Sequence, residues 1–190
     1  MNAIHKLLLM ATLCGAVPAF ATVISIQPSA TTVGAGQTFT LDVSITGAAD
    51  LYAFQFDVGF NPSVLAANSV SEGSFLTSAG TTFFLPGSID NIGGTITFNA
   101  DSLVGAIPGA SGAGILATLS FTSLATGSSA VGLFNVSAFD SFLEGIVLST
   151  PAGSNVTVSG VPEPGSASLL AIGVLVLGVA AYFRARTLSR

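Results

Sequence analysis

The chain is poor in basic residues, and none of them lies in its long middle part. Its 190 residues include four Lys or Arg, one His, one Cys and no Trp. Between Thr22 and Gly160 the sequence has no Lys, Arg, His, Cys or Trp. A domain built from this segment cannot form a Ser-His-Asp triad, a thiol nucleophile, a Schiff base or a zinc site with His and Cys ligands. Nucleic-acid binding is excluded too, because phosphates would meet carboxylates and no cation.

Carboxylates remain, and they leave two weaker alternatives open. Glycoside hydrolysis needs only two carboxyl groups, and calcium takes oxygen ligands of this kind. Solvated strand faces and turns explain such residues more simply, so we expect neither an enzyme nor a cofactor. The carboxylates that could supply a glycosidase pair are Asp42, Asp57, Glu72, Asp90, Asp101, Asp140 and Glu144. The oxygen ligands that could bind calcium are Asp90-Asn91, Asp101-Ser102 and Asp140-Ser141 with Glu144, without an EF-hand spacing.

Residues 1–21 have the pattern of a secretory signal peptide. Lys6 precedes a short apolar run, and the segment ends with the small residues Ala19 and Ala21. This order predicts cleavage after Ala21 and export of the remainder of the chain. His5 and Cys14 lie within the segment, so we expect the mature protein to contain neither an imidazole nor a thiol.

The other end of the chain, residues 161–190, carries a second apolar run next to cations. Residues 167–183 are uncharged, and Arg184 and Arg186 come directly after them. The run is long enough for a short transmembrane helix, and the two arginines predict a cytoplasmic end. The domain at residues 22–160 would then lie on the opposite side of the membrane, in agreement with the signal peptide.

The order of motifs in this tail resembles the PEP-CTERM sorting signal of Gram-negative bacteria. The sequence Pro162-Glu163-Pro164 comes first, then the apolar run, then Arg184 and Arg186. The resemblance implies processing by an exosortase, a membrane-embedded transpeptidase that would cut near the Pro-Glu-Pro motif. We therefore expect a membrane-anchored precursor, exported through the inner membrane and then released to the cell surface or extracellular matrix.

The segment between the two ends has the periodicity of β-strands. In Phe39–Ile45 and again in Tyr52–Phe60, every second residue is apolar, which is typical of strands with one buried face. Gly- and Pro-containing turns separate the runs, including 34–36, 61–63 and 109–114. About nine short strands without a helical window predict an all-β, antiparallel jelly-roll sandwich with the Phe residues in its core. Further strands are expected at Val23–Gln27, Thr81–Leu85, Thr95–Asn99, Ile115–Phe121, Ala130–Phe134, Ile146–Leu148 and Asn155–Ser159.

The order of these pieces resembles a cohesin domain over nearly all of residues 22–160. The motifs that carry the resemblance are Gly36-Gln37-Thr38, Phe60-Asn61-Pro62-Ser63-Val64-Leu65, Gly114-Ile115-Leu116-Ala117 and Asn155-Val156-Thr157-Val158. Cohesins are noncatalytic nine-stranded sandwiches that dock a dockerin module, and related folds include carbohydrate-binding modules. The resemblance implies a binding face around Ala53, Gln55 and Asp57, where type I cohesins carry the Asn and Asp residues that contact dockerin.

Ala53 and Gln55 depart from that pattern, which predicts weaker pairing with a standard dockerin. Two functions of different classes are compatible with the sequence. The first is a noncatalytic surface or matrix protein that binds another exported protein. The alternative is a carbohydrate-binding module for an exopolysaccharide or plant polysaccharide, for which the sequence offers no obvious exposed aromatic platform.

Overall fold

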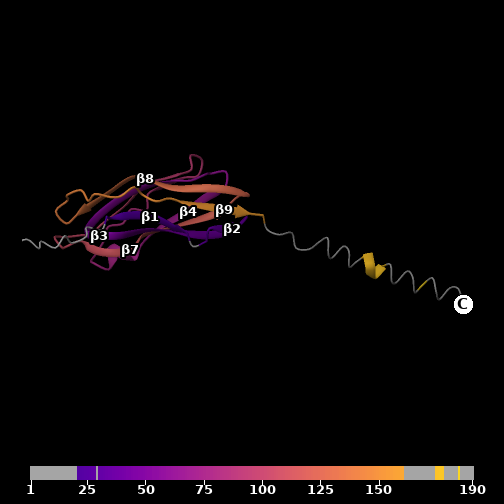
Figure 1. Ribbon diagram of the computed structural model, residues 1–190, viewed down its shortest axis with the longest axis horizontal. Helices are drawn as coiled ribbons and strands as arrows, with labels where there is room; N and C mark the ends of the chain where they lie inside the picture. Colours follow the sequence, from indigo (N-terminus) through magenta and orange to yellow (C-terminus); the bar gives the residue numbers. More distant parts are fainter. Residues whose placement is uncertain (1–20, 29, 161–173, 178–183, 185–190) are drawn as a thin grey trace, which may run out of the picture.

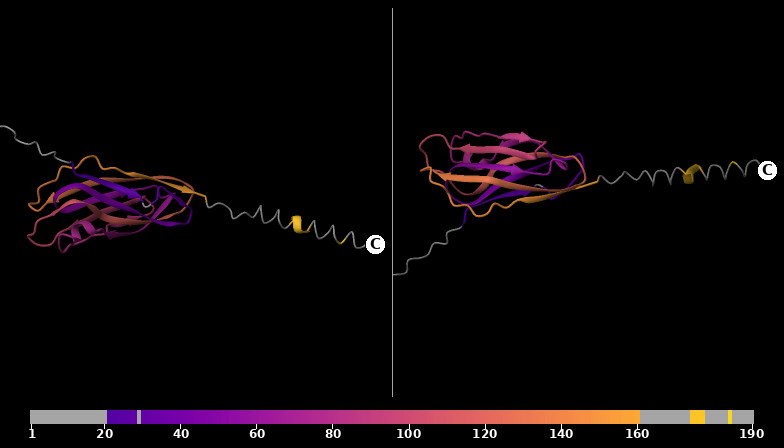
Figure 2. Two further views of the ribbon diagram at one scale, coloured as in Figure 1. Left: turned by 60° about the horizontal axis from the view of Figure 1, so that its bottom comes forward. Right: turned by 90° about the horizontal axis from the view of Figure 1, so that it is seen from above.

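The computed structural model describes residues 21–28, 30–160, 174–177 and 184, and it folds residues 22–160 into an elongated β-sandwich (Figure 1). The strands run lengthwise in all views (Figure 2). The strands are β1 (Val23–Pro28), β2 (Thr32–Gly34), β3 (Thr38–Gly59), β4 (Leu65–Glu72), β5 (Ser88–Asp90), β6 (Thr95–Ser102), β7 (Ala110–Ser123), β8 (Gly127–Asp140) and β9 (Ser154–Ser159). A four-residue helix, α2 (Ser74–Thr77), comes after β4.

Strand β3 is shared by the two layers of the sandwich. Its first half pairs with β1 and β7, and its second half pairs with β6 and β8. The register with β7 shifts between Ile45 and Leu51, where Gly47 and Asp50 have φ angles of 67° and 59°. One layer therefore contains β1, β3, β7 and β4, and the other contains β5, β6, β3, β8, β9 and β2. The expected all-β sandwich of about nine strands is confirmed, but the expectation of antiparallel pairing is wrong for β2 and β9, which run parallel.

Apolar side chains from both layers fill the interior between them. Phe121 on β7 is fully buried and contacts two further rings, with centroid distances of 6.0 Å to Phe39 and 5.2 Å to Phe60. Phe54 and Phe56 on the second half of β3 lie stacked with centroids 5.8 Å apart. Aromatic pairs at these distances add to the stability gained by burying the rings. The alternation in the sequence therefore identifies these members of the core correctly.

Some predicted strand boundaries are wrong. Residues 39–59, expected within two strands, form the single strand β3, because the chain crosses between layers through bulges rather than through a turn. The turn expected at 109–114 lies mostly within β7. The segments 81–85 and 146–148 form only isolated bridges, Thr82 to Leu103, Leu85 to Ala100 and Thr22 to Leu148. Strands β2, β4 and β5 were not expected from the sequence, since they are short or polar and lack a clean alternation.

The sorting signals fall almost entirely outside the residues that the structure describes. This applies to Ala19, Pro162, Glu163, Pro164 and Arg186. Ala21 and Arg184 are described, and both are exposed. Among the described residues, no helix has the length and apolar character needed to cross a membrane. The signal peptide, the transmembrane helix and the boundaries at 22 and 160 stay predictions.

Candidate functional site

The outward face of the layer that contains β8, β3 and β6 has small, half-buried side chains along its centre. Ala53 on β3 lies in register between Ser102 of β6 and Phe139 of β8. Two residues further along β3, Gln55 lies between Ala100 and Ser137. Two of the three residues of the expected binding face, Ala53 and Gln55, thus lie on the central strand of one continuous surface, which we call the docking face.

Exposed phenylalanines border the docking face on both sides. On the side of β6, the exposed fractions are 62% for Phe83 and 55% for Phe98. On β8 they are 40% for Phe134 and 38% for Phe139. The expectation that the Phe residues all belong to the core is therefore wrong for these four, and also for Phe142, which is 82% exposed. A shallow central strip between two aromatic borders is suited to burying apolar area against a partner.

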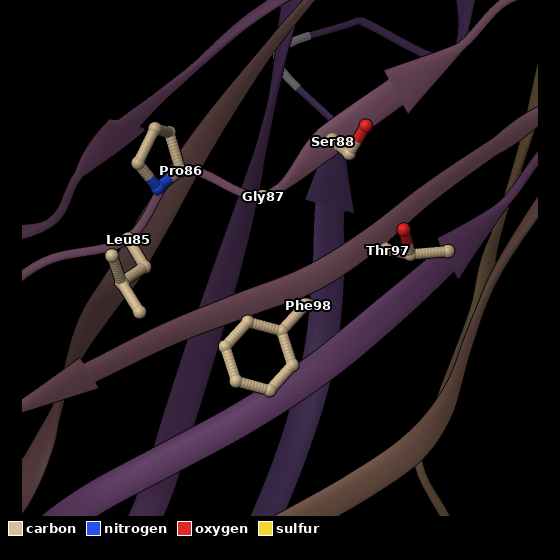
Figure 3. A pocket seen from close by; sticks show the side chains of 6 residues that line it. All are labelled: Leu85, Pro86, Gly87, Ser88, Thr97 and Phe98. Carbon is tan, nitrogen blue, oxygen red and sulfur yellow. The ribbon is translucent and has the colours of Figure 1, made fainter.

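A pocket of about 310 Å³ lies beside Phe98 (Figure 3). The Phe98 ring, Leu85 and Pro86 supply its apolar wall, and Gly87 lies at its edge. A side chain at Gly87 would not fit, because a Cβ there would come within 2.6 Å of the Thr97 carbonyl oxygen. The pocket therefore depends on the close approach of the Gly87 backbone to the Thr97 carbonyl oxygen, and its size suits one apolar group of a partner.

Asp57, the third residue of the expected face, is buried by its own hydrogen bonds. Its Oδ1 accepts from the Phe98 N–H at 2.6 Å, and its Oδ2 accepts from the Asn135 side-chain amide at 2.7 Å. Only 7% of the residue is exposed. Phe98 and Asn135 both have positive φ angles, 59° and 50°, which are unfavourable for residues with a Cβ. Asp57 therefore stabilises the kinks in both neighbouring strands and is not available to a partner.

The kink at Phe98 explains why this ring points outward. The alternation in Thr95–Asn99 would place Ile96 and Phe98 on the same buried side. Instead the register between β3 and β6 shifts between Phe56 and Val58, and Asn99 becomes fully buried while Phe98 is exposed. A bulge of this kind redirects a side chain without ending the strand. The polar partner of the kink, Asp57, lies 41 positions away in the sequence, so local pattern could not reveal it.

Of the oxygen ligands considered for calcium, Asp90 and Asp140 accept hydrogen bonds within turns, whereas Asp101 is buried on β6. Asp140 Oδ1 accepts from the N–H groups of Phe142 and Glu144, both at 2.9 Å. The Ser141 hydroxyl donates to Asp50 Oδ2 at 2.6 Å. Within the described part of the chain, no group of three or more His, Cys, Asp or Glu side chains comes together around a common point. The Asp140–Glu144 turn is thus an Asx-type turn of the ordinary kind.

The fold defines a class of protein, a nine-stranded β-sandwich with an aromatic-bordered outer face. Residues 24–158 match the cohesin domain family. The chain therefore belongs to the cohesin domain family, whose members bind dockerin-bearing proteins. A search of curated proteins found no match.

Solved cohesin structures share this fold at low sequence identity. A non-cellulosomal cohesin from the hyperthermophilic archaeon Archaeoglobus fulgidus is 16% identical, with a TM-score of 0.58, covering 74% of this chain and 92% of that one. A type II cohesin domain from the cellulosome of Acetivibrio cellulolyticus is 17% identical, with a TM-score of 0.60, covering 72% and 95%. The sixth cohesin of scaffoldin B from the same organism, in complex with a Cel5 dockerin variant, is 16% identical, with a TM-score of 0.58, covering 74% and 100%.

Proposed function

We propose that this protein is an exported, noncatalytic adhesion module that binds another exported protein through the docking face. The observation that carries the proposal is the face itself: Ala53 and Gln55 between two borders of exposed phenylalanine. The one carboxylate at its centre, Asp57, is covered and fully hydrogen-bonded, so a partner would not have to desolvate a free charge there. A dockerin-like module on the partner is the natural occupant for a member of this family.

A photo-crosslinking experiment tests the proposal. A photoreactive amino acid at Gln55 should capture a specific protein in the native host, whereas the same probe at Ser44 should not. Ser44 is a matched control, because it is half-buried on the same strand but on the outer face of the other layer. Capture at Ser44 alone, or at neither position, would contradict a docking role for this face.

A carbohydrate ligand is the second candidate, and the exposed rings of Phe98 and Phe134 favour it. Flat aromatic faces can contact the apolar side of a sugar ring, and these two are about half exposed. A glycan array with the intact chain separates the two functions. Saturable binding of one polysaccharide that Phe98→Ala abolishes would assign the face to sugar instead of protein.

We further propose that the chain reaches the cell surface or matrix as an exosortase substrate. The support is sequence order alone, the Pro162–Pro164 motif, then the apolar run, then Arg184 with Arg186. In a host that carries an exosortase, mass spectrometry of the exported protein should show both residues 1–21 and the tail beyond the motif removed. Persistence of the intact tail in such a host would leave it a plain membrane anchor.

A further inference from the structure

Two carboxyl groups lie near each other between the two layers of the sandwich, that of Asp101 on a buried residue and that of Glu72 on a half-buried one. Asp101 on β6 is 3% exposed and faces inward like Asn99 and Leu103, its buried neighbours on the same side of the strand. Glu72, the last residue of β4, comes from the opposite layer; its carboxylate accepts a hydrogen bond from the Thr82 hydroxyl, and Thr82 is bridged to Leu103, two residues from Asp101. The docking face lies on the other side of the sheet that carries Asp101.

The two carboxyl groups have no cation nearby to neutralise them. Neither carboxyl oxygen of Asp101 has a donor in hydrogen-bonding geometry among the described residues, and the sequence from Thr22 to Gly160 contains no basic residue. Glu72 is the titratable group that faces Asp101. The other residues placed beside the pair by strand register and by helix α2 are neutral: Phe54, Thr82, Phe84, Ala117 and Ser74–Thr77.

Two ionised carboxylates close together repel each other, the more so because Asp101 is buried, whereas one proton between them removes the repulsion. A protonated Asp101 also gains an acceptor, since its O–H can donate to Glu72. Burial raises the pKa of Asp101 to about 7, and the negative charge of Glu72 adds to that rise. The pair therefore holds one proton under mildly acidic conditions.

This pair lies at the base of the segment that builds one border of the docking face. Residues 73–87, the edge segment, continue from Glu72 through helix α2, whose Phe75 and Leu76 are buried in the core, and then run along the edge of β6. The segment carries Phe83, Leu85 and Pro86, which form the border and the pocket beside Phe98. Its backbone is held to β6 by the Phe83 N–H bond to the Ser102 carbonyl and the Leu85 N–H bond to the Ala100 carbonyl, both at 2.8 Å.

We propose that Asp101 and Glu72 share a proton and form a pH-dependent latch that fixes the edge segment, and with it the Phe83 and Phe98 border of the docking face. The latch is closed under mildly acidic conditions and loosens as the proton leaves. Its consequence for partner binding rests on the proposed function of the face, but the latch itself does not. Thr82 couples the pair to the segment, because its hydroxyl bonds to Glu72 while its neighbour Phe83 bonds to β6.

Amide hydrogen exchange of the full-length chain in detergent tests the latch without any partner. Protection factors of Phe83 and Leu85, corrected for intrinsic exchange, should fall at least about tenfold between about pH 5.5 and pH 8. Asp101→Asn should abolish that fall, because the amide cannot ionise. Glu72→Gln should displace the fall toward lower pH, because it removes the negative charge that favours the protonated form of Asp101. Protection that is flat in the wild type, or a fall retained in Asp101→Asn, overturns the proposal.

An infrared spectrum gives a second readout, which does not depend on segment motion. The C=O band of a protonated carboxylic acid should be present at mildly acidic pH and missing from Asp101→Asn under the same conditions. Calcium addition against a chelator provides the competing outcome at pH 8. If calcium restores protection in the wild type and not in Asp101→Asn, the pair binds a cation, and the shared proton is the wrong assignment. Failure of photo-crosslinking at Gln55 would remove the docking partner and leave these results unchanged.

Discussion

The two outer faces of the sandwich use the same strand in opposite ways. In its first half, β3 presents Thr38, Asp42 and Ser44 on a surface rich in hydroxyl groups. Those groups bond to one another: Thr38 to Thr122 at 3.2 Å, and Thr118 to Asp42 at 2.7 Å. In its second half, β3 presents Ala53 and Gln55 between exposed aromatic rings.

The difference lies in which groups are left to interact with a partner. On the hydroxyl face the polar side chains pair across strands, so burying them would exchange existing hydrogen bonds and bury little apolar area. On the docking face the one carboxylate, that of Asp57, is buried and already accepts hydrogen bonds from Phe98 and Asn135, and the most exposed side chains are apolar rings. The hydroxyl face therefore offers a partner mainly groups that are already hydrogen-bonded, whereas the docking face offers exposed apolar surface.

The largest difference in unfolding free energy should be between substitutions of two aspartates on β3, Asp57 under the docking face and Asp42 on the hydroxyl face. Asp57→Ala should lower the free energy of unfolding by about 4 kcal/mol, since it leaves the N–H of a left-handed Phe98 without an acceptor and frees the Asn135 kink. Asp42→Ala, which loses only the Thr118 hydroxyl bond, should cost about 1 kcal/mol. Urea unfolding of both variants checks this, and equal losses would mean that Asp57 is not a structural residue.

Between the two faces, the interior carboxyl pair should make stability depend on pH. The folded pKa of Asp101 is raised from 3.8 to about 7, so the folded state binds more protons than the unfolded state within that interval. The contribution is complete at acidic pH and is lost as the pH rises through about 7. Asp101→Asn should then exceed the wild type in unfolding free energy by about 3 kcal/mol at pH 8 and match it near pH 4. If Asp101→Asn were instead less stable than the wild type at pH 8, the pKa of Asp101 would not be raised in the folded state.

An arginine introduced on each face in turn should weaken partner binding on the docking face and leave it unchanged on the hydroxyl face. Gln55→Arg should weaken the complex with the protein captured through position 55 by about 2 kcal/mol, because a bulky charge would have to be desolvated at the centre of the interface. Ser44→Arg, on the hydroxyl face, should leave the affinity within about twofold. Titration calorimetry measures both, and comparable losses would place the interface elsewhere.

The smallest effect is expected within the hydroxyl face. Thr122→Val removes the hydroxyl that bonds to Thr38 and to Asn68, at 3.2 and 3.0 Å. The valine keeps the β-branched shape that strands favour, so the loss should be about 0.5 kcal/mol. Thermal unfolding resolves a change of this size, and a loss several times larger would show that the face is a cooperative network.

Period-two alternation is enough to predict the strands whose one side is buried. Phe39–Ile45 and Asn155–Ser159 obey the pattern along their lengths, and both lie within strands of the structure. Strand β4 does not obey it, because its second half is a polar edge held by pairing with β7 rather than by burial. Leu51 also departs, since the bulges near Asp50 turn it into the core where alternation would expose it.

The docking face was only partly predictable from the sequence. Ala53 and Gln55 can be found from the turn at Asn61-Pro62 by counting back along a strand. The exposure of Phe98 and the burial of Asp57 cannot be found in this way, because they depend on the bond from the Phe98 N–H to Asp57, between two strands that the sequence separates widely. The alternation of apolar residues describes one strand at a time, whereas which side chains are exposed on this face depends on a contact between two strands.

The pairing at the end of the domain bears on how it would carry mechanical load. Strand β9 lies between β2, which runs parallel to it, and β8, which runs antiparallel. The chain leaves the sandwich just beyond Ser159, so tension applied there acts along the axis of β9. Its ladder bonds to both neighbours lie across that axis and would have to break together in shear, rather than one after another as in peeling. A force applied to the C-terminal end of the domain would therefore be resisted by the two ladders that β9 forms with β2 and β8.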